Sequence, residues 1–66
     1  MKKIIVDGKS VNFYGIVKKL NTKKAKVGEV YVVKTKKGRL VPFQRTAKQG
    51  FGAWRILAFD KVKKYL

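Results

Sequence analysis

The acidic side chains of this 66-residue sequence are too few and too scattered to suggest catalysis. Asp7, Glu29 and Asp60 are its carboxylates, and the chain has no His and no Cys. General acid–base chemistry mostly uses His or a carboxylate, and metal sites need clustered His, Cys or oxygen ligands. Ser10 has no His to activate it, although a Lys base stays formally open. We therefore expect no enzymatic activity, no metal and no cofactor.

Positive charge is the property that sets this sequence apart. Eighteen Lys and Arg against three acids give a net charge of +15. The charge is clustered, because residues 18–26 carry five Lys and residues 34–39 carry three Lys and one Arg, with no acid in either segment. A solvated protein surface normally mixes both signs. The two clusters therefore indicate a polyanionic partner more than a merely solvated face.

The kind of cation indicates how that partner would be bound. Fifteen of the 18 cations are Lys, a compact charge suited to phosphate, whereas the Arg that reads guanine edges is scarce. Contacts to phosphates give affinity but little sequence information, so we expect largely sequence-nonspecific binding of nucleic acid. The residues expected to make the contacts are Lys18, Lys19, Lys23, Lys24, Lys26, Lys34, Lys36, Lys37, Arg39, Arg45, Lys48, Phe51 and Arg55.

Aromatic side chains offer a second kind of contact, since they stack on unpaired bases. Phe51 is the best candidate, because it lies between two glycines and close to Lys48, where the backbone could approach a nucleic acid, although the alternative that it fills the core is slightly favoured. Tyr14 is left open in the same way, because Phe13 beside it can supply the burial. The aromatic residues expected in the core are Tyr31, Phe43, Trp54 and Phe59.

The elements that position these side chains begin with a short strand. Residues 2–6 are rich in β-branched side chains and run into Asp7-Gly8, a turn dipeptide. Residues 10–21 allow two interpretations. The apolar spacing, with Ser10 as N-cap, slightly favours a helix, whereas alternation through Val11 and Phe13 describes a strand.

A hairpin is the clearest element of the sequence. Residues 29–35 and 39–45 flank Lys36-Lys37-Gly38, and a three-residue loop ending in Gly suits a type I turn closed by a G1 bulge. This register pairs Tyr31 with Phe43, Val33 with Val41, and Glu29 with Arg45 in a salt bridge. Pro42 has no N–H to donate, so its strand should lie at an edge or present that position outward.

The C-terminal residues again have two interpretations. Residues 53–59 read as a buried strand, and Asp60 as the N-cap of a last helical turn over residues 61–66. One continuous helix from Trp54 is the alternative, because Trp54, Leu57, Lys61 and Tyr65 are also helix-spaced. The negative charge of Asp60 at a helix start favours strand followed by helix.

The chain length and these elements define the expected fold. Sixty-six residues make one domain, spanning residues 1–66. We expect an α+β fold: a small antiparallel sheet or an SH3/OB-like partly open barrel with one or two short helices. Apolar runs are too short for a signal peptide or a membrane span, so we expect a cytoplasmic protein.

A resemblance at the level of class adds to these expectations. The stretch Val27-Gly28-Glu29-Val30-Tyr31-Val32-Val33 resembles the strand entry of SH3-like and OB-like barrels bound to nucleic acid, and the composition resembles small lysine-rich ribosomal and archaeal nucleoid proteins. The lopsided charge is more similar to the ribosomal kind. The resemblance implies an RNA-binding, ribosome-associated protein.

Two other partners remain open from the sequence. The alternative to RNA is double-stranded DNA, bound by a nucleoid or viral protein. Binding to an anionic membrane surface or to an acidic protein is less well supported, because residues 10–21 place their Lys at one end instead of along a polar face. No small-molecule substrate is indicated, because no glycine-rich nucleotide motif is present.

Overall fold

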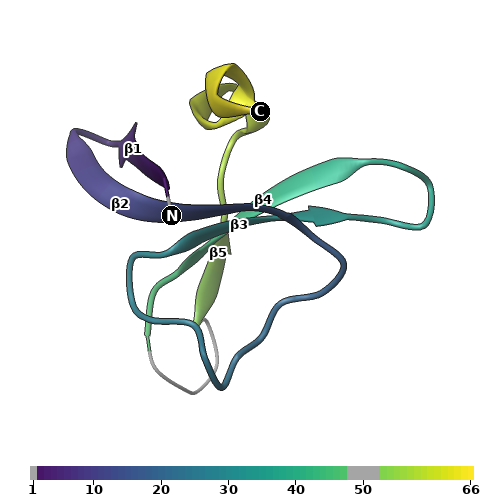
Figure 1. The fold of residues 1–66 in the computed structure, drawn as a ribbon, viewed down its shortest axis with the longest axis horizontal. Coiled ribbons are helices and arrows are strands. Elements are labelled where there is room, and N and C mark those ends of the chain that lie inside the picture. Colours follow the sequence, from purple (N-terminus) through teal and green to yellow (C-terminus); the bar gives the residue numbers. More distant parts are fainter. Residues whose placement is uncertain (1, 48–52) are drawn as a thin grey trace.

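One five-stranded sheet forms the body of the protein (Figure 1). A computed structural model describes residues 2–47 and 53–66. The strands are β1 (Lys2–Val6), β2 (Lys9–Val17), β3 (Val30–Lys34), β4 (Leu40–Arg45) and β5 (Trp54–Ile56), adjacent in that order. Two short 3-10 turns follow, η1 (Phe59–Lys61) and η2 (Lys63–Tyr65).

The expected fold class is therefore only partly confirmed. The domain is small and dominated by an open sheet, but the described residues contain no α-helix, so the helices of an α+β fold are absent from this part of the chain. The sheet is also mixed, because β2 and β3 run parallel while the other neighbours are antiparallel. Parallel neighbours need a long crossover, and residues 18–29 supply it. We call residues 18–29 the connector.

The first strand and its turn are as the sequence predicts. β1 pairs with β2 from Lys2 opposite Phe13 to Val6 opposite Lys9. The two turn residues, Asp7 and Gly8, both have positive φ, at 52° and 80°. This is the combination that a two-residue type I′ hairpin turn requires, and Asp-Gly is among the pairs that adopt it most readily.

The helix favoured for residues 10–21 is wrong, and β2 occupies most of that segment. Phe13 is buried while its neighbour Tyr14 is exposed, which is the alternation of a strand. β1 on one side and β3 on the other satisfy the backbone of β2, and the pairing with β3 comes from residues far along the chain. Gly15, with a φ of 79°, lies where the β2–β3 register shifts between Phe13 and Ile16.

The hairpin of β3 and β4 has the predicted register. Tyr31 lies opposite Phe43 and Val33 opposite Val41. The three-residue loop is closed by the Thr35 N–H donating to the Arg39 carbonyl at 2.8 Å, and Gly38 has a φ of 82°. These features are those of the bulged type I turn that the sequence indicates.

Pro42 lies in an interior strand and not at an edge, so of the two placements expected from the sequence only the second, with the nitrogen turned away from the paired strand, applies. β4 has β3 on one side and β5 on the other. Pro42 faces Val32, at a position whose nitrogen points away from β3 in the alternating antiparallel pattern. On that side β5 has already ended, and the Leu57 N–H donates to the Pro42 carbonyl at 3.0 Å. The missing N–H therefore interrupts no ladder bond.

The core lies between one face of the sheet and the C-terminal turns. The buried side chains that pack together come from β1, β2, β3 and the last ten residues: Ile4, Val6, Phe13, Val30, Val32, Leu57 and Val62. Tyr65 packs against this cluster, and its hydroxyl oxygen accepts a hydrogen bond from the Ile5 N–H at 3.2 Å. The two ends of the chain are thus joined on the same side of the sheet.

The C-terminal segment follows the predicted order, with two corrections. The strand is shorter than residues 53–59, and Asp60 lies within η1, whose N-cap is Ala58 with no side-chain cap. A single α-helix does not form. Burial of Leu57 and Val62 against the sheet accounts for this, because it requires the chain to leave β5 and turn back at once.

Ion pairs link the first turn of the sheet to its last strand. Asp7 pairs with Arg55 of β5 at 2.9 Å and with Lys61 of η1. Arg55 also donates to the Gln44 side chain at 2.8 Å, and Gln44 in turn donates to the Gly28 carbonyl at 3.2 Å. The hydrogen bonds to the two carboxylate oxygens lower the pKa of Asp7. The sheet therefore curls so that its first hairpin approaches β5, although it does not close.

Candidate nucleic-acid interface

The first lysine cluster begins beside the second at one end of the sheet. In the parallel β2–β3 pair Val17 lies opposite Val33, so Lys18, which follows β2, comes out beside Lys34, the last residue of β3. The chain then enters the β3–β4 turn. We call this end of the sheet the basic end, made of the exposed residues Lys18, Lys19, Lys34, Lys36, Lys37 and Arg39.

The hairpin that carries most of the basic end is well defined. Thr35 organises its turn, because its backbone pairs with Arg39 and its hydroxyl oxygen accepts a second hydrogen bond from the Arg39 N–H at 3.1 Å. Figure 1 shows the β3–β4 hairpin, in teal, extending beyond the rest of the molecule. The turn lysines are therefore presented to solvent on a rigid projection.

The connector carries the remaining lysines of its cluster on an ordered turn. The Asn21 side-chain oxygen accepts hydrogen bonds from the backbone N–H groups of Lys23 and Lys24, both at 3.2 Å, and the Asn21 carbonyl accepts one from Ala25 at 3.0 Å. Ala25 is buried, whereas Lys23, Lys24 and Lys26 are exposed. This turn fixes the backbone from which the three lysines project.

Glu29 attaches the end of the connector to the sheet. Its carboxylate is 3% exposed and accepts hydrogen bonds from the Lys26 N–H at 2.6 Å, the Tyr31 hydroxyl at 3.0 Å and the Tyr14 hydroxyl at 2.7 Å. Burial alone would raise the pKa of Glu29, but these three donors and the nearby Lys26 charge outweigh it and lower that pKa. Burial and the same carboxylate raise the pKa of Tyr31.

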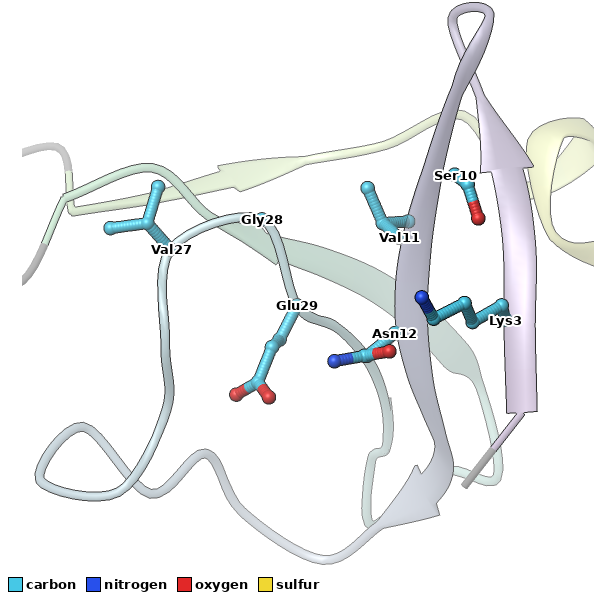
Figure 2. A pocket seen from close by; sticks show the side chains of 7 residues that line it. All are labelled: Lys3, Ser10, Val11, Asn12, Val27, Gly28 and Glu29. Atoms are coloured by element: carbon cyan, nitrogen blue, oxygen red, sulfur yellow. The ribbon is translucent and has the colours of Figure 1, made fainter.

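A small opening lies beside this carboxylate (Figure 2). Its volume is about 170 Å³, and its lining residues are Lys3, Ser10, Val11, Asn12, Val27, Gly28 and Glu29. Sites for small molecules usually occupy about 300–1,000 Å³. The carboxylate at its edge already accepts three hydrogen bonds. This opening is therefore too small for a typical small-molecule site, and the hydrogen-bonding capacity of its one acid is already used within the protein.

Arg45 is buried, so we remove it from the expected contact residues. It is 2% exposed, its guanidinium lies 5.0 Å from the centre of the Trp54 ring, and its Nη2 donates to the Thr22 carbonyl at 3.2 Å. The expected salt bridge with Glu29 is replaced by a backbone bond, the Arg45 N–H donating to the Glu29 carbonyl at 2.9 Å. Arg45 thus holds the connector onto the sheet.

The remaining expected contact residues, Arg55, Lys48 and Phe51, are not placed at the basic end by the structure. Arg55 is exposed, but it is paired with Asp7 beside the first hairpin turn, far along the sheet from the basic end. Lys48 and Phe51 lie outside the described residues. The basic end and the connector therefore contain the contact residues that the fold brings together.

The three acids all lie away from the basic end. Asp7 is in the β1–β2 turn, Glu29 precedes the start of β3, and Asp60 is in η1. In the parallel pair the start of β3 lies opposite Phe13 and its end lies beyond Val17, so Asp7 and Glu29 are at one end of the sheet and the basic end is at the other. The positive potential of the basic end is thus left without a carboxylate to reduce it.

Tyr14, whose role the sequence left open, is exposed and lies beside Glu29 and the end of the connector. Tyr14 is 41% exposed and stacks on Tyr31, with ring centres 4.6 Å apart and an angle of 5° between the planes. Tyr31 meets Trp54 edge to face at 5.6 Å. We call Tyr14, Tyr31 and Trp54 the aromatic cluster. A strand reading of residues 10–21 would have placed Tyr14 on the face opposite Phe13, which is the signal that could have revealed it.

The described part of the chain has neither a metal-binding cluster nor a membrane-spanning helix. Residues 2–47 and 53–66 hold no group of three or more His, Cys, Asp or Glu that could bind a metal ion. No helix in the same residues is long and apolar enough to cross a membrane. Comparison with known proteins finds no matching family model, no similar curated protein and no similar solved structure.

Proposed function

We propose that this is a non-catalytic, cytoplasmic RNA-binding protein that contacts phosphates through the basic end and the connector. The observation that carries the proposal is the parallel β2–β3 register, which brings Lys18, the first residue of one lysine cluster, beside Lys34 of the other. Lysines that serve only to keep a surface solvated have no need to lie side by side. A nucleic-acid backbone, with closely spaced negative charges, matches this arrangement.

The composition of the basic end supports binding with little sequence preference. Five of its six cations are Lys, which contact phosphates as point charges, and its one Arg is the only residue there suited to reading a base edge by a bidentate pair. The ordered turns of the hairpin and connector position these charges before binding. The curled open sheet supports the further proposal of an SH3- or OB-like partly open barrel.

The charge excess also bears on where such a protein would act. A net charge of +15 on 66 residues opposes the folded state by self-repulsion unless a polyanion neutralises it. Ribosomal RNA offers phosphates on several sides of a small protein, which suits cations spread over the hairpin and connector. We therefore propose association with the ribosome.

The salt dependence of binding tests the phosphate contacts. If about six phosphates are neutralised, the slope of log K against log salt is about −4 on single strands and about −5 on duplexes. Replacing Lys34, Lys36 and Lys37 with Gln should flatten the slope by about 2 to 3. The matched control replaces the exposed Lys2, Lys3 and Lys9, which removes the same charge from β1 and β2. Equal flattening in both variants would show that the basic end is not the contact surface.

Competition separates RNA from the alternative of duplex DNA. A labelled structured RNA is bound at physiological salt and challenged with unlabelled RNA or with duplex DNA of equal phosphate content. We expect RNA to be the better competitor and the protein to co-sediment with ribosomes from cells. Equal competition by duplex DNA, with no protein in the ribosome fraction, would instead support a nucleoid-type protein.

A further inference from the structure

The exposed ring of Tyr14 combines three properties that point to a specific ligand chemistry. One face of the ring is covered by Tyr31, so the exposed 41% of the residue lies on the other face and the ring edge. A flat aromatic surface on a soluble protein is a stacking platform for another planar group. Tyr31, stacked on its inner face, and Trp54, which meets Tyr31 edge to face, support this surface from behind.

The ring is also fixed in place before any ligand arrives. Its hydroxyl donates to a Glu29 oxygen at 2.7 Å, and its inner face rests on Tyr31. Glu29 is itself buried and bonded to the Lys26 N–H and the Tyr31 hydroxyl. A side chain held at both its tip and its face loses little conformational freedom when it binds, which favours affinity.

The third property is the attachment of the lysine-bearing turn to the partners of the ring. The Glu29 carboxylate accepts hydrogen bonds from both the Tyr14 hydroxyl and the Lys26 N–H. The connector is therefore linked to Tyr14 through this one carboxylate. At its other end the turn is held by Arg45, which lies on Trp54 and donates to the Thr22 carbonyl. The exposed lysines at positions 23, 24 and 26 are therefore carried on a turn anchored at both ends to the aromatic cluster.

We propose that Tyr14 stacks on an unpaired base of single-stranded RNA while the connector lysines bind the adjoining phosphates. This inference rests on the proposed function and deepens it by naming the form of RNA. A duplex hides its base faces and offers Tyr14 nothing to stack on, whereas the basic end can bind the phosphates of either form. The aromatic ring therefore gives a preference for single strands that lysines alone would not.

The test compares a 12-nucleotide oligouridylate with a 12-base-pair RNA duplex by fluorescence anisotropy. Tyr14→Ile removes the ring but keeps a residue suited to a strand, and we expect it to weaken oligouridylate binding about 5- to 100-fold. Binding to the duplex should change by less than about twofold. Tyr14→Phe and Tyr14→Trp keep a ring, and we expect both to bind the oligouridylate within about threefold of the unmodified protein.

Phe59→Ile is the matched control. Phe59 is an aromatic residue with the same exposure, 40%, and has lysines close to it in sequence, but it lies in η1, across the sheet from the connector (Figure 1). We expect its replacement to leave oligouridylate binding unchanged. Thermal unfolding of each variant confirms that the folded state is compared.

The outcomes separate this inference from the proposed function. If Tyr14→Ile weakens both ligands equally, or neither, while the unmodified protein binds RNA, stacking by Tyr14 is refuted and phosphate binding stands. If Tyr14→Trp binds as poorly as Tyr14→Ile, the ring is not the contact, and the inference also fails. If the unmodified protein binds neither RNA, the proposed function itself is refuted.

Discussion

The buried carboxylate of Glu29 connects the sheet, the connector and the exposed aromatic ring. It accepts its three hydrogen bonds from Lys26, Tyr14 and Tyr31, which come from three different segments. A buried anion is tolerated only when such donors replace the water it has lost. One side chain thus fixes the position of the connector relative to the exposed ring of Tyr14.

This arrangement makes the stability of the protein depend on acid pH. The pKa of Glu29 in the folded state is below its ordinary value of 4.5, so the unfolded chain binds more protons between the two values. The stabilisation is therefore complete above about pH 4.5 and is lost as the pH falls through the folded-state pKa. We expect the urea midpoint to fall between pH 6 and pH 3.

Glu29→Gln tests the assignment. At pH 7 the variant should lose about 1.5–3 kcal/mol, because hydrogen bonds to a charged group are lost. It should also show a smaller decline in acid, retaining the part due to Asp7, whose pKa is lowered too. Asp60→Asn removes an exposed carboxylate of the same charge as a control. An equal acid decline in Glu29→Gln and the unmodified protein would contradict the role of Glu29.

Single residues were the least predictable part of the site. The surface position of the Lys clusters could be predicted from the sequence, because a lysine needs no partner within the protein to lie on the surface. Arg45 could not, since its burial depends on Trp54 from a later strand and on the Thr22 carbonyl from the connector. Tyr14 likewise took its role from Glu29 and Tyr31, neither of which adjoins it in sequence.

At the scale of elements, local turns explain what the sequence predicted and distant pairing explains what it missed. Both hairpin turns were recognised from Asp7-Gly8 and Lys36-Lys37-Gly38, since turn chemistry resides in neighbouring residues. β2 was misread because its strand state depends on the parallel partner β3, which no short window contains. The C-terminal turns differ from a capped helix for a similar reason, the packing of Val62 into the core.

Gly15 lies at the irregularity that allows β2 to pair with both β1 and β3. Its φ of 79° falls where the β2–β3 register shifts, and a Cβ there would meet no atom within 4 Å. Gly15→Ala should therefore destabilise the protein by about 1–2 kcal/mol through backbone strain alone. Gly15→Asn should lose less, because Asn adopts positive φ more readily. Urea unfolding measures both.

Ser10→Ala, an exposed change in the same strand, is the control for that experiment. It should have little effect on the urea midpoint. If Gly15→Ala and Ser10→Ala are equally stable, Gly15 is not required for the bulge in β2.

At the scale of the whole molecule, the cations are close enough to repel one another. The described residues span 30 × 27 × 20 Å, and charges interact over about 10 Å at 0.1 M salt. Among the described residues, the ion pairs of Asp7 with Arg55 and Lys61 oppose this repulsion, but they involve two of the many cations. Repulsion is therefore the larger electrostatic effect on folding.

Added salt should consequently stabilise the protein. We expect the thermal midpoint to rise between 0.02 M and 0.5 M NaCl, because screening weakens like-charge repulsion. A variant with Gln at all six positions of the basic end carries +15 − 6 = +9 and should show a smaller rise. A midpoint that falls with salt would mean that the Asp7 ion pairs outweigh the repulsion.

The parallel β2–β3 pair also has a consequence for how the chain folds. Each half of the sheet contains a hairpin with a tight local turn, and the two halves are joined strand to strand along this pair. Local hairpins form before distant pairings, so we expect the joining of the two halves to be the late step. It is also the step that brings Lys18 up to Lys34 against their mutual repulsion. If the protein binds RNA as we propose, a strand of RNA present at that moment would also speed its assembly.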